Sequence, residues 1–229
     1  MSSAARRMSS VSKPVLALNS IRGQSGKHTL IEQLELSGLH VFRVAFADVL
    51  KEECSQVLVG GPGRAAVTLE RAMHSSSKDI PVAELCAVNI AKSSYRAWLL
   101  DRVPFNELMT PRSPRLHLQQ YGTEYIREHL GKKSYWLDQG CEHIAFALSN
   151  RSNADVVVVT DMRLPNEYDR MFSMDARMVR IVRNWFNPNV DTQSYHQSDI
   201  SLMAHRFDAL VVNEWGKPEA MYDQIKEFL

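Results

Sequence analysis

The most informative part of the sequence is the run Ser25-Gly26-Lys27-His28-Thr29, which follows the apolar residues Val15–Leu18 and precedes a helical pattern. A strand, a Gly-Lys turn and a helix in this order are typical of a phosphate-binding loop. Backbone N–H groups at the helix start face the anion, and the lysine ammonium reaches its outer oxygens. A solvated lysine at an ordinary helix start is the alternative, but the position after the first apolar strand favours phosphate binding.

This loop departs from the usual pattern G-x-x-x-x-G-K-[ST] at two positions. Ile21 stands where the first glycine belongs, and His28 stands where the hydroxyl residue belongs. Thr29, one residue later, is the hydroxyl group that remains to face a metal ion, and Ser20 and Gly23 keep the loop small.

Composition restricts the class of protein. The 229 residues are 45% hydrophobic and 23% charged, as in soluble globular proteins of one domain. The net charge of +1 argues against a protein that coats a nucleic-acid polymer, which needs a large cationic excess. Three scattered cysteines without a C-x-x-C pair argue against a zinc site or a disulfide framework. No apolar run is long enough for a membrane span.

The amino-terminal residues 1–13 hold Arg6, Arg7, Lys13 and several serines but no acid. Such a segment is either a transit peptide or a disordered tail, and its low apolar content favours the tail. We expect the remaining residues 14–229 to form one domain.

Strands and helices alternate along this domain, which predicts an α/β fold of three layers with a five-stranded parallel sheet. The expected strands are 15–18, 39–46, 156–159, 178–182 and 209–212. The expected helices are 27–37, 48–58, 64–74, 82–101, 114–130, 137–148 and 217–229. Several helices follow one another between about residues 60 and 150, and this region is expected to bind substrate and form a lid.

A second candidate site follows the β-branched run Val156–Val159, which is typical of a strand buried on both faces. Asp161 and Arg163 come directly after it, at the ligand-binding edge of an open α/β sheet. An Asp there holds Mg²⁺ or its water shell, and an Arg reaches phosphoryl oxygens. A surface Asp-Arg pair is the alternative, and we favour the functional interpretation. Glu167 is either a first-turn acid that the helix dipole favours or a residue that orients Arg163.

A third candidate lies around Gly122, which costs about 1 kcal/mol relative to Ala inside a helix. Either a ligand or a neighbouring helix approaches it closely, and the pattern does not decide between them. Gln119 and Thr123 share one helix face and suit hydrogen bonding to a base or sugar. Trp136 could stack on a base, although Trp is more often a core residue. The segment His196–Asp199 predicts a helix cap at Ser198 or Asp199.

Together these segments resemble the phage-type deoxynucleoside monophosphate kinases over nearly the whole chain beyond residue 14. Five ordered blocks carry the resemblance: Ser25–Thr29, Phe46–Lys51, Pro114–Glu124 with Arg127 and Trp136, Asp161–Glu167, and His196–Asp199 before a strand that ends in Asn213. The family pattern differs at Ile21, His28, Val49 and Asp199, where it commonly has Gly, Asp, Pro and Glu.

The resemblance implies an adenylate-kinase-like fold with a phosphate loop, a nucleotide cleft and a mobile lid. It implies ATP binding by Ser25, Gly26, Lys27, His28 and Thr29, catalysis by Lys27, Asp161 and Arg163, and Mg²⁺ binding by Thr29 and Asp161. It implies substrate binding by Lys51, Arg115, Gln119, Gly122, Thr123, Trp136, Asp161, Arg163 and Glu167.

The expected activity is therefore ATP-dependent phosphorylation of a deoxynucleoside monophosphate. A kinase of another small phosphorylated acceptor, such as phosphomevalonate, is an alternative on the same fold. A nucleotide-binding module with impaired catalysis is another, motivated by Ile21 and His28. The expected partners are small nucleotides or a second copy in a homodimer, rather than a nucleic-acid polymer or a membrane. The expected compartment is the cytoplasm, which is the host cytoplasm for a phage-encoded enzyme.

Overall fold

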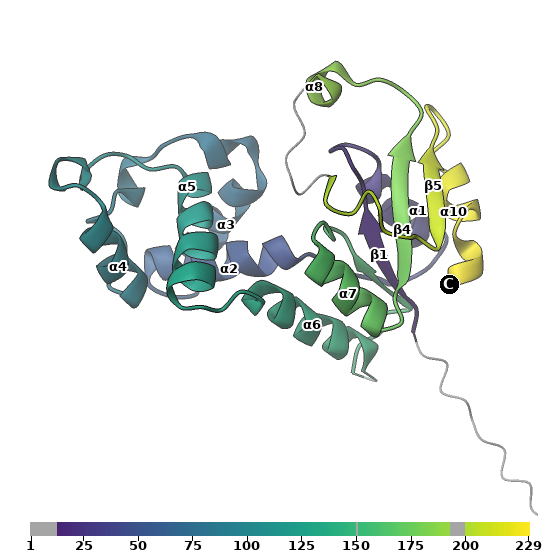
Figure 1. The fold of residues 1–229 in the computed structure, drawn as a ribbon, viewed down its shortest axis with the longest axis horizontal. Coiled ribbons are helices and arrows are strands. Elements are labelled where there is room, and N and C mark those ends of the chain that lie inside the picture. Colours follow the sequence, from purple (N-terminus) through teal and green to yellow (C-terminus); the bar gives the residue numbers. More distant parts are fainter. Residues whose placement is uncertain (1–12, 150, 193–199) are drawn as a thin grey trace, which may run out of the picture. The chain divides into compact units, whose positions relative to one another are not determined.

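A computed structural model describes residues 13–149, 151–192 and 200–229, and these form two compact units (Figure 1). The sheet unit comprises the chain up to Ala45 and again Glu142–Leu229, and the helical unit comprises Phe46–Cys141. The division places the first strands, the phosphate loop and the last three strands in the sheet unit.

The sheet unit contains five parallel strands in the order β2-β3-β1-β4-β5, which confirms the predicted α/β fold. The strands are β1 (Val15–Asn19), β2 (Val41–Val44), β3 (Val156–Val159), β4 (Arg177–Arg183) and β5 (Ala209–Asn213). Every residue of β1 and β3 is buried, as the uninterrupted apolar runs predict for central parallel strands. The central position of β1 puts the phosphate loop at the middle of the sheet edge.

Helices cover both faces of this sheet. Leu16 and Leu18 of β1 pack in one core with α1 (Lys27–Leu36) and with Met221 of α10 (Ala220–Asp223). The alternate strand residues, which point to the opposite face, are also buried. This second face lies on the side of α7 (Pro165–Ser173) (Figure 1). The three layers therefore follow from strands that are apolar on both sides.

The helical unit consists of short helices around an aromatic core. Tyr95, Trp98, Tyr121, Tyr125 and Trp136 pack against one another in this core. The helices are α2 (Phe46–Val59), α3 (Arg64–His74), α4 (Ser94–Arg102), α5 (Pro114–Gln119), the π-helical segment η4 (Gln120–His129) and the first half of α6 (Tyr135–Leu148). The turns η1 (Ser76–Asp79), η2 (Ala83–Leu85) and η3 (Phe105–Glu107) connect them.

Two predicted helices are wrong in part. The expected helix 82–101 begins only at α4, because the Ser93 hydroxyl caps it by accepting a hydrogen bond from the Arg96 N–H (3.1 Å). The expected helix 217–229 is reduced to α10 and the turn η5 (Lys226–Phe228). There the Gln224 carboxamide bonds to both backbone groups of Val212 and so ties the segment to the edge strand.

The remaining sequence predictions have different outcomes. The expected helix 114–130 forms as α5 followed by the π-helical η4. Most of the expected tail, residues 1–12, and the expected cap at His196–Asp199 lie outside the described residues. Lys13 is described, and its ammonium donates to the carbonyls of Ala147 in the last turn of α6 and of Ser149 and Ser152 beyond it.

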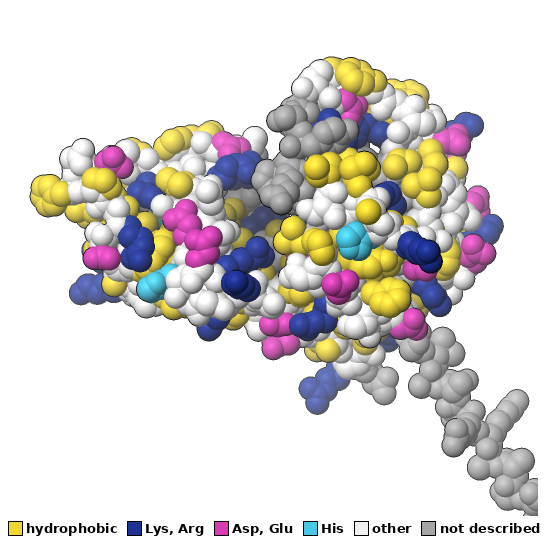
Figure 2. All heavy atoms as spheres, in the orientation of Figure 1, with side chains coloured by type: hydrophobic (Ala, Val, Ile, Leu, Met, Phe, Trp, Pro, Cys, Tyr) yellow, Lys and Arg dark blue, Asp and Glu magenta, His cyan; other side chains and the backbone are white. Residues whose placement is uncertain are grey.

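The surface of each unit carries both signs of charge, with Lys and Arg interspersed among Asp and Glu on the face that Figure 2 shows. This mixture agrees with the net charge of +1. Among the described residues, none of the helices is long and apolar enough to span a membrane.

Candidate functional site

The phosphate loop joins β1 to α1 in a compact turn. The hydroxyl groups of Ser20 and Ser25 both donate to the carbonyl of Arg22, at 3.0 and 2.6 Å. Helix α1 begins at Lys27, and within the described residues no side chain caps its first turn. The first N–H groups of a helix lack intrahelical partners, so this terminus offers donors to an anion.

Gly26 is the residue on which the loop turns. Its φ of +102° lies in the left-handed region that favours glycine. Asn213, at the end of β5, is buried against it and donates through Nδ2 to the carbonyl of Ser25 (3.3 Å). A Cβ on Gly26 would lie only 2.9 Å from Cγ of Asn213. Both backbone conformation and packing therefore require glycine at this position.

Lys27, His28 and Thr29 differ in exposure. The Lys27 ammonium donates to Oγ of Ser20 (3.0 Å), so it lies at the junction of β1 and the loop. The His28 side chain is 72% exposed, with Nε2 3.2 Å from Oε1 of Glu32 on the next helical turn. Thr29 is half-buried. The histidine at the usual hydroxyl position therefore belongs to the outer surface of α1, and Thr29 is the more enclosed of the two.

Asp161 and Arg163 follow β3 at the same sheet edge as the phosphate loop. The register pairs Ala17 with Val159, so Asp161 comes level with the end of β1. Buried Asn19 donates through Nδ2 to the carbonyl of Met162 (3.0 Å) and thereby ties the two strand ends together. Sequence reasoning did not identify Asn19, because a single Asn at a strand end carries no distinctive pattern.

Glu167 holds the backbone that follows β3. Its carboxylate is buried and accepts hydrogen bonds from the N–H groups of Arg163 (2.7 Å) and Leu164 (3.0 Å). This contact is the carboxylate half of a capping box at the start of α7. Glu167 therefore caps the start of α7 and, through the same hydrogen bonds, fixes the backbone of Arg163.

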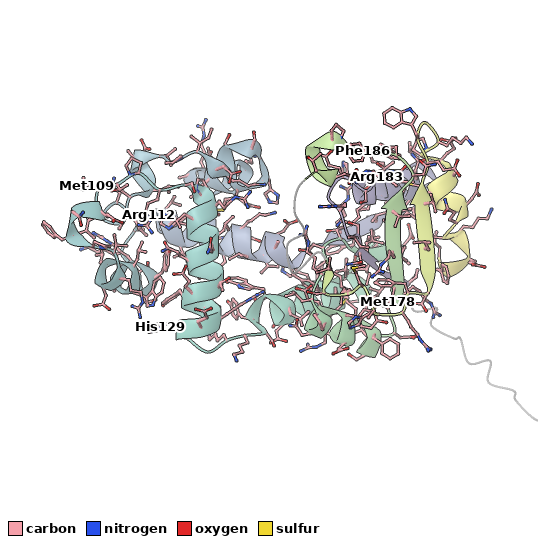
Figure 3. The ribbon with its side chains drawn as sticks, turned by 45° about the horizontal axis from the view of Figure 1, so that its top comes forward. Met109, Arg112, His129, Met178, Arg183 and Phe186 are labelled. Carbon is pink, nitrogen blue, oxygen red and sulfur yellow. The ribbon has the colours of Figure 1, made fainter. Side chains whose placement is uncertain are left out.

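A cavity of about 510 Å³ adjoins the phosphate loop within the sheet unit. Ile21, Arg22 and Ser25 line it from the loop, and the residues at the carboxyl end of β4 line it from the neighbouring strand. Arg183 and Phe186 belong to this end, and Met178 lies at the opposite end of β4 (Figure 3). Ile21, which replaces the usual glycine, thus forms part of the wall of the cavity.

In the helical unit, Gly122 and Trp136 are buried in the core. A Cβ on Gly122 would lie 2.7 Å from Leu50, so close helix packing explains this glycine. The Trp136 side chain is 2% exposed and its indole N–H donates to the Gly122 carbonyl (3.1 Å). Gln119 and Thr123 are exposed on the same helix. Their substrate-binding roles stay predictions.

The two other predicted substrate-binding cations have acidic partners within the helical unit. Lys51 donates to Oδ1 of Asp48 (2.7 Å) and lies 3.2 Å from Nδ1 of His74. Arg115 pairs with Asp79, and this hydrogen bond lowers the pKa of the Asp79 carboxyl. Both cations are therefore already fixed in ion pairs at the surface.

Sequence reasoning also missed a buried polar pair in the helical unit. His117 is fully buried between the carbonyl of Leu85, 2.8 Å from Nε2, and the hydroxyl of Tyr95, 3.0 Å from Nδ1. Burial lowers the pKa of His117 to about 4, so Nε2 donates and Nδ1 accepts in the neutral ring. Figure 3 shows Arg112 and His129 toward opposite ends of the α5–η4 helix that carries this histidine.

Thr29 and Asp161 are the residues predicted to hold Mg²⁺. The described residues contain no group of three His, Cys, Asp or Glu side chains that could hold a metal ion. Mg²⁺ in nucleotide sites commonly takes one or two protein oxygens, with phosphate and water completing the shell. A threonine hydroxyl in the first turn of α1 and an aspartate carboxylate after β3 fit that requirement in donor chemistry.

Comparison with known proteins tests the family resemblance that the sequence motifs suggest. The family model for deoxynucleotide monophosphate kinase matches residues 68–225, more than half of the chain. The match includes Gly122, Trp136, Asp161 and Glu167 but begins after the phosphate loop. No curated protein sequence matches the chain. The phosphate loop therefore rests on its own sequence and geometry.

Proposed function

Because this chain belongs to the deoxynucleotide monophosphate kinase family, we propose that it transfers the γ-phosphoryl group of ATP to a deoxynucleoside monophosphate. An oxygen of the acceptor phosphate forms the new bond to the γ-phosphorus, and the bond from that phosphorus to the β–γ bridging oxygen breaks. The products are ADP and the deoxynucleoside diphosphate. The observation that carries the proposal is the Gly26-Lys27 turn at the start of α1, beside the strand end of Asp161.

Phosphoryl transfer asks a protein mainly to position two phosphates and to neutralise spread negative charge. The first-turn N–H groups of α1 and the Lys27 ammonium supply fixed positive character for the donor phosphates. Arg163, held by its backbone contact to Glu167, supplies a guanidinium at the neighbouring strand end. Within this scheme the reaction needs no dedicated general base.

Thr29 and Asp161 are the oxygen donors that we assign to Mg²⁺. When bound, this ion neutralises charge on the donor phosphates. The contribution of the chain is to hold the two oxygens: the first turn of α1 fixes Thr29, and the end of β3 fixes Asp161.

We assign acceptor recognition to the exposed helix face of Gln119 and Thr123, four residues apart. Their amide and hydroxyl groups suit hydrogen bonding to a base or a sugar. Lys51 and Arg115 supply positive charge on the same unit, where each pairs with a carboxylate. A phosphate can replace that carboxylate, because the oxygens of both groups accept charge-assisted hydrogen bonds from a cation. Buried Gly122 and Trp136 act indirectly by setting the position of this helix.

Ile21 favours one competing proposal, a nucleotide-binding module with impaired catalysis. Ile21 lines the cavity beside the phosphate loop, at the position where the usual pattern has glycine. Binding of ATP without ADP formation, with every acceptor tried, would support the module over the kinase.

The test is the variant Lys27→Ala, assayed for ADP formation with ATP and a deoxynucleoside monophosphate. We expect kcat to fall by about 10²-fold or more, as when one transition-state donor is removed elsewhere. Lys217→Ala is the matched control, because Lys217 is exposed and pairs only with Glu214 on the same turn among the contacts described for it. Wild-type turnover by Lys27→Ala would contradict the assignment.

A further inference from the structure

A carboxylate lies against two arginines beside the phosphate loop. Oδ1 of Asp191 accepts a hydrogen bond from a terminal nitrogen of Arg183 at 2.5 Å and lies 3.9 Å from Nε of Arg22. The backbone carbonyl of Asp191 also accepts from Arg22 (3.4 Å). Asp191 belongs to the short helix α8 (Pro188–Asp191), which follows β4. All these residues lie in the sheet unit.

Both arginines are fixed to the phosphate loop. Arg22 is itself a loop residue, and Arg183 donates its other terminal nitrogen to the carbonyl of Gly23 (2.8 Å). The Arg183 side chain is only 5% exposed, and its Nε has no hydrogen-bond partner among the described residues. Its N–H is therefore a donor that remains for an acceptor oxygen in the adjoining cavity.

The Asp191 carboxylate is the anion that faces Arg22 and Arg183. Its second oxygen accepts from the Asn187 N–H (2.6 Å), and Asn187 in turn donates to the Gln24 side chain (2.7 Å) in the loop. The hydrogen bond from the Asn187 N–H and the guanidinium of Arg183 hold the pKa of the Asp191 carboxyl below its usual range. Arg22, Arg183 and Asp191 all line the cavity of about 510 Å³.

We propose that Asp191 is an internal anion that competes with the phosphate groups of the donor nucleotide for Arg22 and Arg183. Carboxylate and phosphate oxygens satisfy a guanidinium in the same geometry, so the two anions exclude one another. Nucleotide binding then requires that the arginines exchange Asp191 for phosphate. The inference rests on the proposed function, because it takes the loop to be the donor site.

The alternative is that Asp191 only braces the loop. The two accounts predict opposite effects on nucleotide affinity when the Asp191 carboxylate is removed. A competing anion weakens nucleotide binding, so its removal tightens binding. A brace holds the arginines in place for the nucleotide, so its removal weakens binding.

The experiment is calorimetric titration of the full chain and of Asp191→Asn with ATP and with inorganic tripolyphosphate. We expect Asp191→Asn to bind both ligands at least about 5-fold more tightly, the lower range of typical coupling between sites. Asp223→Asn is the control, since it removes the same charge from an exposed ion pair with Lys226. The control should keep the wild-type Kd within about twofold, as expected for a screened surface charge. Asp191→Ser, with the same expectation, replaces Asp191→Asn if the latter does not fold.

A second arm removes the arginine. In the Arg183→Gln background, Asp191→Asn should have a smaller effect, because one of the two arginines for which Asp191 competes is absent. Equal tightening in both backgrounds would overturn the inference in favour of a general charge effect. If the wild type binds and turns over ATP but Asp191→Asn binds the ligands no more tightly, the inference is overturned and the proposed function stands. Failure of every form to bind ATP or tripolyphosphate overturns both the inference and the proposed function.

Discussion

The side chain of Asn213 packs against Gly26, so the end of the last strand determines which residue the phosphate loop can hold. The Asn213 amide donates to the carbonyl of Ser25, directly before this glycine. The two residues are far apart in sequence, and the parallel sheet brings them together at one edge. The loop is therefore shaped by β5 as well as by its own sequence.

The first prediction concerns Gly26→Ala. An alanine there meets two penalties: a left-handed φ, which costs about 1–2 kcal/mol, and the overlap with Asn213. We expect loss of ATP affinity together with lower stability to urea. Gly38→Ala is the matched control, because Gly38 has a φ of +93° but open space around it. A control that lost ATP affinity as strongly as Gly26→Ala would contradict the role of Asn213.

The second prediction tests the packing directly through a double variant. Asn213→Ala removes Nδ2 and Cγ, the two atoms that an alanine at position 26 would meet most closely. We therefore expect Gly26→Ala with Asn213→Ala to be more stable than the sum of the single effects, by about 0.5–3 kcal/mol. Urea unfolding of the four proteins measures this coupling. Strictly additive effects would mean that the two side chains do not conflict.

The third prediction compares two glycines of the helical unit. A Cβ on Gly140 would meet the buried ring of Phe46, with Cε1 at 2.8 Å, whereas one on Gly122 would meet the flexible end of Leu50. A phenyl ring in a packed core yields less than an isobutyl group. We expect Gly140→Ala to cost about 1–3 kcal/mol of stability and Gly122→Ala to cost less. The reverse order in thermal or urea unfolding would contradict these contacts.

The fourth prediction concerns pH. The pKa of His117 is about 4 in the folded chain against an ordinary value of 6.5, so the unfolded state binds its proton more readily. The stabilisation is complete above pH 6.5 and is lost as the pH falls toward 4. A shift of this size corresponds to about 3 kcal/mol.

His117→Gln removes this titration, so its stability should depend less on pH between 6.5 and 4 than that of the wild type. Unfolding by urea at a series of pH values measures the difference. His143→Gln controls for loss of an exposed imidazole. Parallel curves for the wild type and His117→Gln would show that His117 does not titrate in this way.

The sequence predicted the sheet well and the helices less well. Runs such as Val156–Val159 have one reasonable conformation, so a strand forms at each of the five expected places, although the second is shorter than expected and Phe46 begins α2. Helix ends depend on single hydrogen bonds, such as the Ser93 cap or the Gln224 contact with Val212. Those contacts depend on residues that periodicity does not distinguish, and the expected helices 82–101 and 217–229 were therefore too long.

The candidate site shows the same division. The Gly26-Lys27 turn and the strand end at Asp161 follow from local pattern, because each motif is continuous in sequence. Asn19, Asn213 and Asp191 act through partners up to 188 residues away, so no local pattern indicates them. Gly122 was recognised as unusual, but only the contact with Leu50 distinguishes packing from ligand approach.

The central claim is tested most directly by ADP formation and product analysis with purified protein, ATP, Mg²⁺ and a panel of acceptors. The panel contains the deoxynucleoside monophosphates and phosphomevalonate as the phosphorylated alcohol. We expect ADP and a deoxynucleoside diphosphate in equal amounts with at least one monophosphate, and neither with phosphomevalonate. ADP formation with phosphomevalonate alone, or ATP binding with no ADP from any acceptor, would contradict the account.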